Sequence, residues 1–188
     1  SALLRIAFEG CGGSAAGSPT LMAEVAFELL QTYLLIHDDW MDGDEVRRGG
    51  PSVHVMLRSS FPGTSDAAGV LAGDYVCAAA QHALLEVAAP AQRLVDASRA
   101  FAQIHRDVVL GQALDIAALS DVPIERIHAL KTATYTVTGP LEIGAILAGA
   151  SRETRDHFVR FGLPLGIAFQ LRDDLLSMFG APEKTGKT

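Results

Sequence analysis

Apolar residues recur along this chain three or four positions apart, which is the spacing of one face of a helix. The first clear run contains Leu21, Met22, Val25, Leu29 and Leu30. Ser18 can cap that helix and Pro19 can take its first position, so we predict a helix from there to Asp38. No segment shows the sustained two-residue alternation of half-buried strands, and the pattern therefore predicts an all-α fold.

Prolines and glycines divide the rest of the chain into further helices. We predict them over 66–88, 90–118, 123–138 and 141–150, with a last one from Ser151 onwards. Gly139 and Pro140 should end the helix before them, because proline lacks a donor. Pro164 should kink or restart the last helix, and Gly180 should close it. The polar, glycine-rich stretch 43–51 predicts a loop.

The chain has 188 residues, of which 49% are hydrophobic and 20% charged. This length is enough for one core and is about the size of one domain. No repeat, low-complexity tract or linker divides it, so we predict a single bundle of antiparallel helices over 1–188.

Charge and cysteine content exclude several classes of protein. The formal net charge of -7 argues against a nucleic-acid binder, which normally carries a basic stripe. Cys11 and Cys77 have no paired spacing, so they indicate neither a disulfide framework nor a zinc site, and a reduced, cytoplasmic setting is the default. No apolar run reaches about 18 residues, so we expect no membrane span.

Two aspartate clusters lie at the ends of otherwise apolar helical segments: Asp38-Asp39-Trp40-Met41-Asp42 and Asp173-Asp174. Asp38 and Asp42 would share a helix face, where like charges repel by about 0.2–0.5 kcal/mol. Mg²⁺ compensates such charge, since it takes one or two carboxylates and completes its shell with water and phosphate oxygens. A solvated acidic helix end is the alternative. A calcium loop fits worse, because Trp40 stands where that pattern needs Asp or Asn.

Five motifs follow one another in a fixed order. They are His37-Asp38-Asp39-Trp40-Met41-Asp42, Arg47-Arg48-Gly49, Gly111-Gln112-Ala113-Leu114-Asp115, Lys131-Thr132 and Phe169-Gln170-Leu171-Arg172-Asp173-Asp174. In this order they resemble the trans-isoprenyl diphosphate synthases, also called polyprenyl synthetases, over nearly the whole chain. The resemblance implies helices around a central cavity, a homodimer and more than one Mg²⁺ per site. It also implies an enzyme that condenses isopentenyl diphosphate with an allylic diphosphate by ionisation, condensation and proton loss.

The resemblance also assigns roles to residues. It implies that Asp38, Asp39, Asp42, Asp173 and Asp174 bind the metal ions. Arg47 would hold the allylic diphosphate and Arg48 the isopentenyl diphosphate, for which a forked guanidinium is suited. Lys131, Thr132, Gln170 and Lys187 would approach the diphosphate or the developing cation, whereas for Gln112 and Asp115 we expect a structural role.

Tyr33 precedes Asp38 by five residues, which places it about 7.5 Å deeper along a helix. In the resembling family a bulky residue there limits elongation, and Leu34 can share that role. Together with the two residues between Asp39 and Asp42, this resembles enzymes that make geranylgeranyl diphosphate, with farnesyl diphosphate as the next choice. The alternative for Tyr33 is a plain core residue.

The chain departs from the family pattern at several positions. Ser177 stands where many relatives carry a third aspartate, and Gln31 stands where a histidine often contacts isopentenyl diphosphate. The family pattern also begins before Ser1, with a Gly-Gly-Lys-Arg segment, and continues past Thr188, so we expect this chain to be part of a longer protein.

Two further functions stay open. A class I terpene cyclase shares the helical architecture and the ionisation chemistry, but should carry an Asn/Ser/Glu metal motif where Asp173 and Asp174 stand. A non-catalytic subunit of a heteromeric synthase is favoured by Ser177 and Gln31, and disfavoured by the intact first aspartate cluster.

Overall fold

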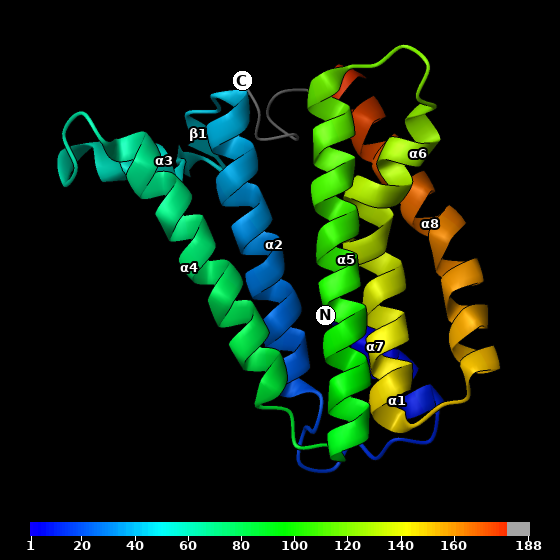
Figure 1. Cartoon of the computed structure of the whole chain (residues 1–188). Coiled ribbons are helices and arrows are strands. Elements are labelled where there is room, and N and C mark those ends of the chain that lie inside the picture. The colour runs from blue at the N-terminus through cyan, green and yellow to red at the C-terminus, as the bar shows by residue number, and fades with distance from the viewer. Residues whose placement is uncertain (180–188) are drawn as a thin grey trace.

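Long helices dominate the computed structural model of this chain, which describes residues 1–179 (Figure 1). The elements are α1 (Ala2–Gly10), α2 (Leu21–Asp42), β1 (Val46–Arg47), β2 (Gly50–Pro51), α3 (Val53–Met56), η1 (Leu57–Ser59), α4 (Ser65–Leu85), α5 (Ala91–Ala117), α6 (Ile124–His128), η2 (Ala129–Thr138), α7 (Gly139–Ala148) and α8 (Arg152–Phe179). α2 packs along α4, whereas η2 packs between α5 and α8 and α1 lies against α7. The predicted all-α bundle is therefore confirmed.

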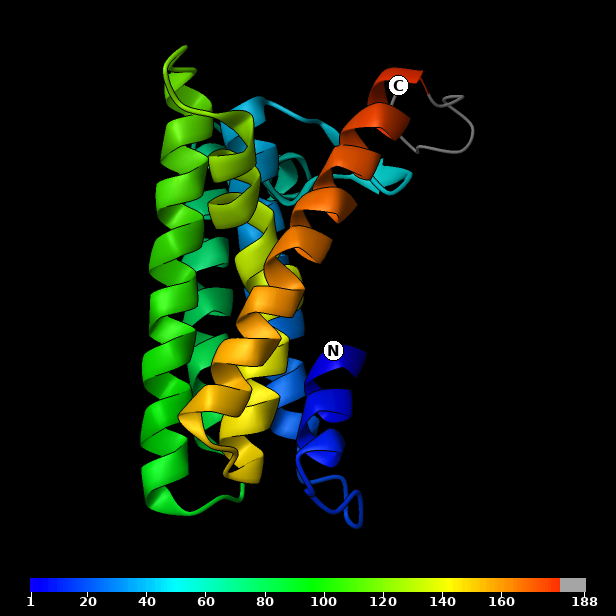
Figure 2. The ribbon, with the colours of Figure 1, turned by 90° about the vertical axis from the view of Figure 1, so that its right-hand side faces the viewer.

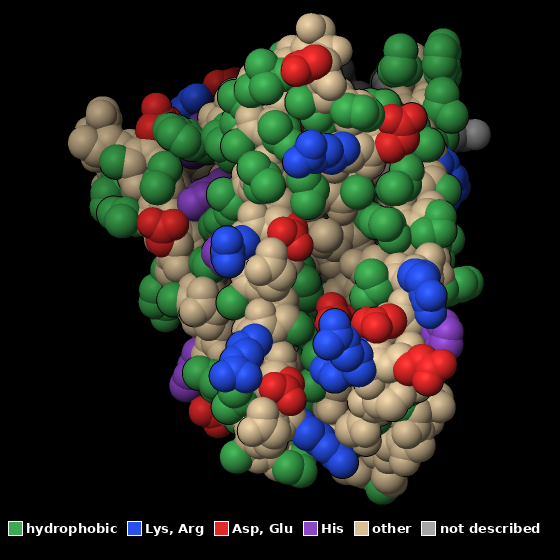
Figure 3. Space-filling view, turned by 45° about the vertical axis from the view of Figure 1, so that its right-hand side comes forward, with side chains coloured by type: hydrophobic (Ala, Val, Ile, Leu, Met, Phe, Trp, Pro, Cys, Tyr) green, Lys and Arg blue, Asp and Glu red, His purple; other side chains and the backbone are tan. Residues whose placement is uncertain are grey.

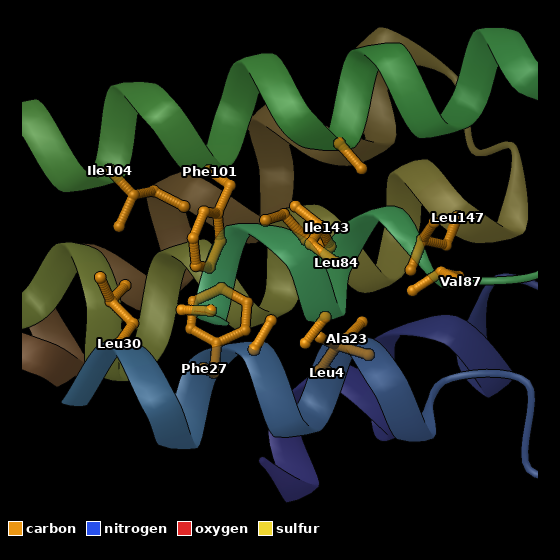
Figure 4. Close-up of a cluster of buried hydrophobic side chains, with 14 of the residues drawn as sticks. Leu4, Ala23, Phe27, Leu30, Leu84, Val87, Phe101, Ile104, Ile143 and Leu147 are labelled. Atoms are coloured by element: carbon orange, nitrogen blue, oxygen red, sulfur yellow. The ribbon is translucent and has the colours of Figure 1, made fainter. Parts of the chain in front are cut away.

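Apolar side chains from five helices form the main core (Figure 4). Leu4, Phe27, Leu84, Phe101 and Ile143 come from α1, α2, α4, α5 and α7 in turn. The rings of Phe27 and Phe101 meet edge to face with their centroids 5.4 Å apart, an arrangement that aromatic pairs favour. This core joins α2, α4 and α5 to one another, and it therefore holds the end of α2 beside α5.

Some predicted helix boundaries are wrong. α2 begins at Leu21 and not at Pro19, because Ser18 adopts a positive φ of 51° and its carbonyl closes a turn with the N–H of Leu21. Gly139 and Pro140 begin α7 directly after η2, without a break in the chain's helical course. Proline is tolerated there because it stands in the first turn of a new helical segment, where its missing N–H costs little.

The last helix does not restart at Pro164. α8 runs through Pro164 as one element, and its start is capped as predicted, with the N–H of Thr154 donating to Ser151 Oγ at 3.2 Å. The predicted end at Gly180 lies outside the described residues. Figure 2 shows α8 crossing the face of the bundle towards the end at which α2 also finishes.

The predicted loop 43–51 contains a short antiparallel hairpin, in which Arg47 pairs with Gly50. Its two linking residues, Arg48 and Gly49, both have a positive φ, 53° and 79°, as a type I′ turn requires. The hairpin follows α2 directly, because Gly43 ends that helix in the left-handed conformation. The tight turn brings Arg47 back towards the end of α2.

None of the helices within residues 1–179 is long and apolar enough to cross a membrane. Apolar side chains nevertheless gather on the upper part of the face that carries α5, α6 and α8 (Figure 3). The exposed large apolar residues of α5 and α8 include Val109, Leu110, Ile116, Phe169, Leu175, Leu176, Met178 and Phe179. The second half of α8 thus exposes several large apolar side chains.

Candidate functional site

The two aspartate clusters lie at the same end of the bundle, where α2, α5 and α8 all finish (Figure 1). Asp38, Asp39 and Asp42 occupy the last turns of α2, and Asp173 and Asp174 stand near the end of α8. The π-helix η2 begins between them and packs on both α5 and α8. π-Helical turns are rare and occur frequently at functional sites.

Asp38 is held by two side chains from neighbouring helices. Gln112 of α5 donates from Nε2 to Asp38 Oδ1 at 3.2 Å, and Lys131 Nζ of η2 lies 3.4 Å from the same oxygen. Lys131 also donates to Asp115 Oδ2 at 2.6 Å. The ammonium group therefore lies between a carboxylate of α2 and one of α5, and it offsets part of their negative charge.

Lys131 keeps its positive charge despite its partial burial. Burial by itself lowers the pKa of Lys131, but the hydrogen bond to Asp115 and the charge of Asp38 outweigh this effect, so the net pKa is raised. An amine with a raised pKa stays protonated at neutral pH. Lys131 therefore offers a fixed cation to an anionic group that approaches the end of α2.

Asp39 and Arg47 form a second ion pair. The carboxylate of Asp39 is only 3% exposed, and its Oδ1 accepts hydrogen bonds from both Nε (2.7 Å) and Nη2 of Arg47. The Arg47 Nη2 atom also lies 3.7 Å from Asp38 Oδ2 and 3.9 Å from Asp44 Oδ2. The hydrogen bond to Asp39 raises the pKa of Arg47 although burial opposes it. The hairpin thus anchors its guanidinium at the acidic helix end.

Asp42 is the exposed member of the first cluster. Its pKa is raised, first by partial burial and then by the negative charge of Asp38, while Lys131 acts in the opposite direction. A raised pKa means that the ionised form lacks sufficient compensation from the protein alone. A divalent cation beside Asp38 and Asp42 would supply that compensation.

The second cluster is linked to η2 by a chain of hydrogen bonds. Thr132 donates from Oγ1 to Gln170 Oε1 at 2.7 Å, and Gln170 donates from Nε2 to Asp174 Oδ1 at 2.8 Å. The other oxygen of Asp174 lies 3.1 Å from His128 Nε2, and His128 is only 6% exposed. Both oxygens of Asp174 are therefore engaged by the protein.

Asp173 is half-buried, and within residues 1–179 it takes part in no ion pair. Tyr135, one turn beyond Lys131 on η2, connects it electrostatically with the first cluster. Burial raises the pKa of Tyr135, and the charges of both Asp38 and Asp173 add to the increase. The negative charges of both acidic helix ends thus act on the same hydroxyl of η2.

The donor set fits Mg²⁺ bound together with a phosphate ligand. In the part of the chain that the structure describes, no three His, Cys, Asp or Glu side chains converge to hold an ion by themselves. Mg²⁺ does not need such a cage, because it usually binds through one or two carboxylates, water and substrate phosphates. Asp38, Asp42 and Asp173 offer hard carboxylate oxygens of that kind.

Other residues with predicted roles lie in varied surroundings. Arg48 is exposed in the hairpin turn, Gln31 is partly buried in α2, and Leu34 packs against the main core. Tyr33 is buried, with 8% of its surface exposed. Lys187 and the side chain of Ser177 lie outside what the structure describes, so their roles stay predictions.

Sequence reasoning missed several members of the site. Gln112 and Asp115, for which we expect a structural role, link α5 to Asp38 of α2 and to Lys131 of η2. His128 shows no metal-ligand spacing in the sequence, yet it contacts Asp174. A π-helix changes which residues share a face, so the usual four-residue spacing could not place Tyr135 of η2.

Two hollows in the described part of the molecule lie at the opposite end of the bundle. One is lined by residues of α1 and α2 such as Arg5 and Glu24, and the other by residues that include Phe8, Arg93 and Leu147. Neither borders an aspartate of the two clusters, and the chemistry of the site therefore does not involve them.

Comparison with known proteins identifies what this arrangement is similar to. The sequence profile described as polyprenyl synthetase matches residues 3–188. A (2E,6E)-farnesyl diphosphate synthase of Mycobacterium tuberculosis is 36% identical over 190 residues, which cover 99% of this chain and 50% of the relative. A geranylfarnesyl diphosphate synthase of Natronomonas pharaonis is 38% identical over 172 residues, covering 89% of this chain and 48% of the relative.

Solved structures similar to this chain are also prenyl synthases. The geranylgeranyl pyrophosphate synthase of Corynebacterium glutamicum, crystallised with isoprenyl diphosphate and magnesium, superposes with a TM-score of 0.87 at 34% identity, covering 99% of this chain and 57% of that one. A polyprenyl synthetase of Streptomyces coelicolor gives a TM-score of 0.83 at 34% identity, covering 100% and 53%. This chain spans about half the length of the relatives it matches.

Proposed function

The chain belongs to the polyprenyl synthetase family, and we propose that the protein containing it is a Mg²⁺-dependent prenyltransferase. Its reaction would condense isopentenyl diphosphate with an allylic diphosphate to give a short-chain product, geranylgeranyl diphosphate in the first place and farnesyl diphosphate in the second. The named relatives include farnesyl, geranylgeranyl and geranylfarnesyl diphosphate synthases. They support prenyl transfer but do not single out one product length.

One observation carries the proposal: neighbouring residues of η2 contact both acidic helix ends. Lys131 lies 3.4 Å from Asp38, and Thr132 donates to Gln170, which in turn donates to Asp174. Two facing sets of carboxylates with a fixed cation between them form a site for a polyanion bridged by metal ions. A solvated acidic helix end would not need these partly buried contacts from a third helix.

Asp38, Asp39, Asp42, Asp173 and Asp174 are the proposed metal-binding residues. Asp38, Asp42 and Asp173 suit direct binding best, since Arg47 engages Asp39 and the Gln170–His128 contacts engage Asp174. Bound Mg²⁺ would neutralise charge on the diphosphate and so make it a better leaving group.

The protein's own cations and dipoles would do the rest of the work. Arg47 and Lys131 would bind the allylic diphosphate and stabilise the charge that grows on it as the carbon–oxygen bond breaks. The hydroxyl of Thr132 and the amide of Gln170 would orient towards the allylic cation, and the apolar helix walls would exclude water. Arg48 and Gln31 would contribute to the isopentenyl diphosphate site.

The direct test is an assay of the full-length protein with Mg²⁺, isopentenyl diphosphate and a labelled allylic diphosphate. We expect a longer diphosphate that is absent when EDTA removes the metal and returns when Mg²⁺ is added back. No elongated product at any Mg²⁺ concentration would refute the proposal and favour a non-catalytic subunit. A hydrocarbon formed without isopentenyl diphosphate would instead identify a terpene cyclase. A homodimer and a cytoplasmic setting stay predictions.

A further inference from the structure

Tyr33 makes a specific hydrogen bond that its suggested role as a plain bulky residue does not require. Its hydroxyl lies 3.1 Å from Nε2 of His105, which comes from α5. Tyr33 itself is 8% exposed and belongs to the main core. A buried hydroxyl without a partner costs about 1–3 kcal/mol, so His105 determines where the tyrosine ring can lie at low cost.

Two histidines also enclose the ring by packing. Tyr33 meets His37 edge to face with centroids 4.8 Å apart, and it meets His105 in the same way at 5.2 Å. His37 is fixed in turn, because its Nε2 lies 3.0 Å from the carbonyl oxygen of Val70 on α4. A Cβ at Gly73 would come within 2.3 Å of that nitrogen, so the missing side chain at Gly73 lets the His37 ring approach α4 closely.

His105 also lies against α4. Cys77 Sγ lies 3.9 Å from both ring nitrogens of His105, and Gln81 approaches the same sulfur at 3.9 Å. Burial lowers the pKa of His105 and raises that of Tyr33, to whose increase Cys77 and Asp74 add. Both rings are therefore neutral at neutral pH, and the bond joins two uncharged groups from α2 and α5.

We propose that His105 is a positioning residue for product length, because its imidazole holds the Tyr33 ring across the path of the growing prenyl chain. The proposal rests on the proposed function. A chain whose diphosphate is bound at Asp38 and which extends along α2 meets Tyr33 about 7.5 Å deeper. Without His105 the ring loses its tether, and the space vacated between α2 and α5 lets it turn aside.

The test compares product spectra of full-length variants supplied with isopentenyl diphosphate and an allylic diphosphate. His105→Ala should raise the ratio of longer to shorter products about three- to tenfold, the range set by one net hydrogen bond. His105→Gln, which keeps an N–H donor, should stay closer to the unmodified spectrum. His82→Ala is the matched control, since His82 is an exposed histidine of α4, and it should change nothing.

Tyr33→Phe removes the same hydrogen bond from the other side while it keeps the ring. It should shift the products in the same direction as His105→Ala, and the double variant should add little, since residues that share one interaction are not additive. If His105→Ala fails to fold, Tyr33→Phe decides alone. An unchanged spectrum in the folded variants, while Tyr33→Ala still lengthens the products, would overturn the proposal and leave the proposed function intact. Absence of any elongated product from the unmodified protein would overturn the proposed function instead.

Discussion

Replacing Gly111 with alanine should move the helix that carries Lys131 and so weaken both the fold and the site. Gly111 lies in α5 where η2 crosses it, and an alanine Cβ there would be 2.4 Å from the backbone nitrogen of Lys131 and 2.8 Å from the carbonyl carbon of Leu130. Ordinary contact begins at 3.4 Å. The neighbouring atoms are backbone, so η2 as a whole must shift by about 1 Å to restore that contact.

The magnitude follows from two opposing terms. Alanine favours a helix interior over glycine by about 1 kcal/mol, whereas overpacking costs about 1–3 kcal/mol and is worst against rigid atoms. We expect a net loss of about 1–2 kcal/mol, which lowers Tm by about 2–4 °C for each kcal/mol. A misplacement of about 1 Å can also lower turnover about a hundredfold, because Lys131 is 2.6 Å from Asp115 and 3.4 Å from Asp38.

Thermal unfolding and steady-state turnover of the full-length protein measure both effects. Gly10→Ala is the matched control, since Gly10 ends α1 with nothing within 4 Å of an added Cβ, and it should leave Tm equal or slightly higher. If Gly111→Ala behaves like this control in both measurements, the close approach of α5 and η2 does not position Lys131, and the reasoning is wrong.

Three further outcomes are expected. A double-mutant cycle of Asp39→Ala and Arg47→Ala should give a coupling of about 1–3 kcal/mol in the free energy of unfolding, because Asp39 is buried and accepts from two guanidinium nitrogens; independent effects would contradict the pairing. Burial raises the pKa of Glu142, so the fold loses stability as the pH rises above the usual pKa of a glutamate and this carboxyl group ionises. Glu142→Gln should therefore raise Tm at pH 7 but not at pH values below the usual carboxyl range. A Tm gain that persists in acid would argue against this cause. His128→Ala should lower activity or Mg²⁺ affinity about 10- to 100-fold, because Asp174 loses the contact that orients its carboxylate. Unchanged Mg²⁺ titration curves of activity would assign His128 a packing role only.

The sequence predicted the helices well wherever the apolar period was regular. α4 and α5 lie close to the predicted ranges, and Ser151 caps α8 as expected. The failures occur where backbone geometry departs from an ordinary α-helix. Ser18 closes a turn with a positive φ, which a capping pattern does not reveal. Pro140 does not stop the helical course, because it begins α7 directly after a π-helix that nothing in the sequence indicates.

For the candidate site, the sequence identified most of the charged residues but not the contacts between them. Aspartates, arginines and Lys131 could be identified from motifs, because their charges at the ends of apolar segments need an explanation. Which carboxylate faces which cation could not be derived, since the Asp39–Arg47 pair depends on a hairpin turn and the Lys131–Asp115 contact depends on the register of η2 against α5. The hydrogen bond from His105 to Tyr33 joins residues 72 positions apart and has no local signal.

The most direct test of the central claim is the turnover of full-length Asp38→Ala and Asp173→Ala variants at saturating Mg²⁺, with folding checked by circular dichroism. If the acidic ends of α2 and α8 together bind metal ions and a diphosphate, each variant should lose at least about a hundredfold in kcat, as expected when one electrostatic contact to a leaving group is removed. Variants that fold normally and elongate the allylic diphosphate at the unmodified rate would contradict the account.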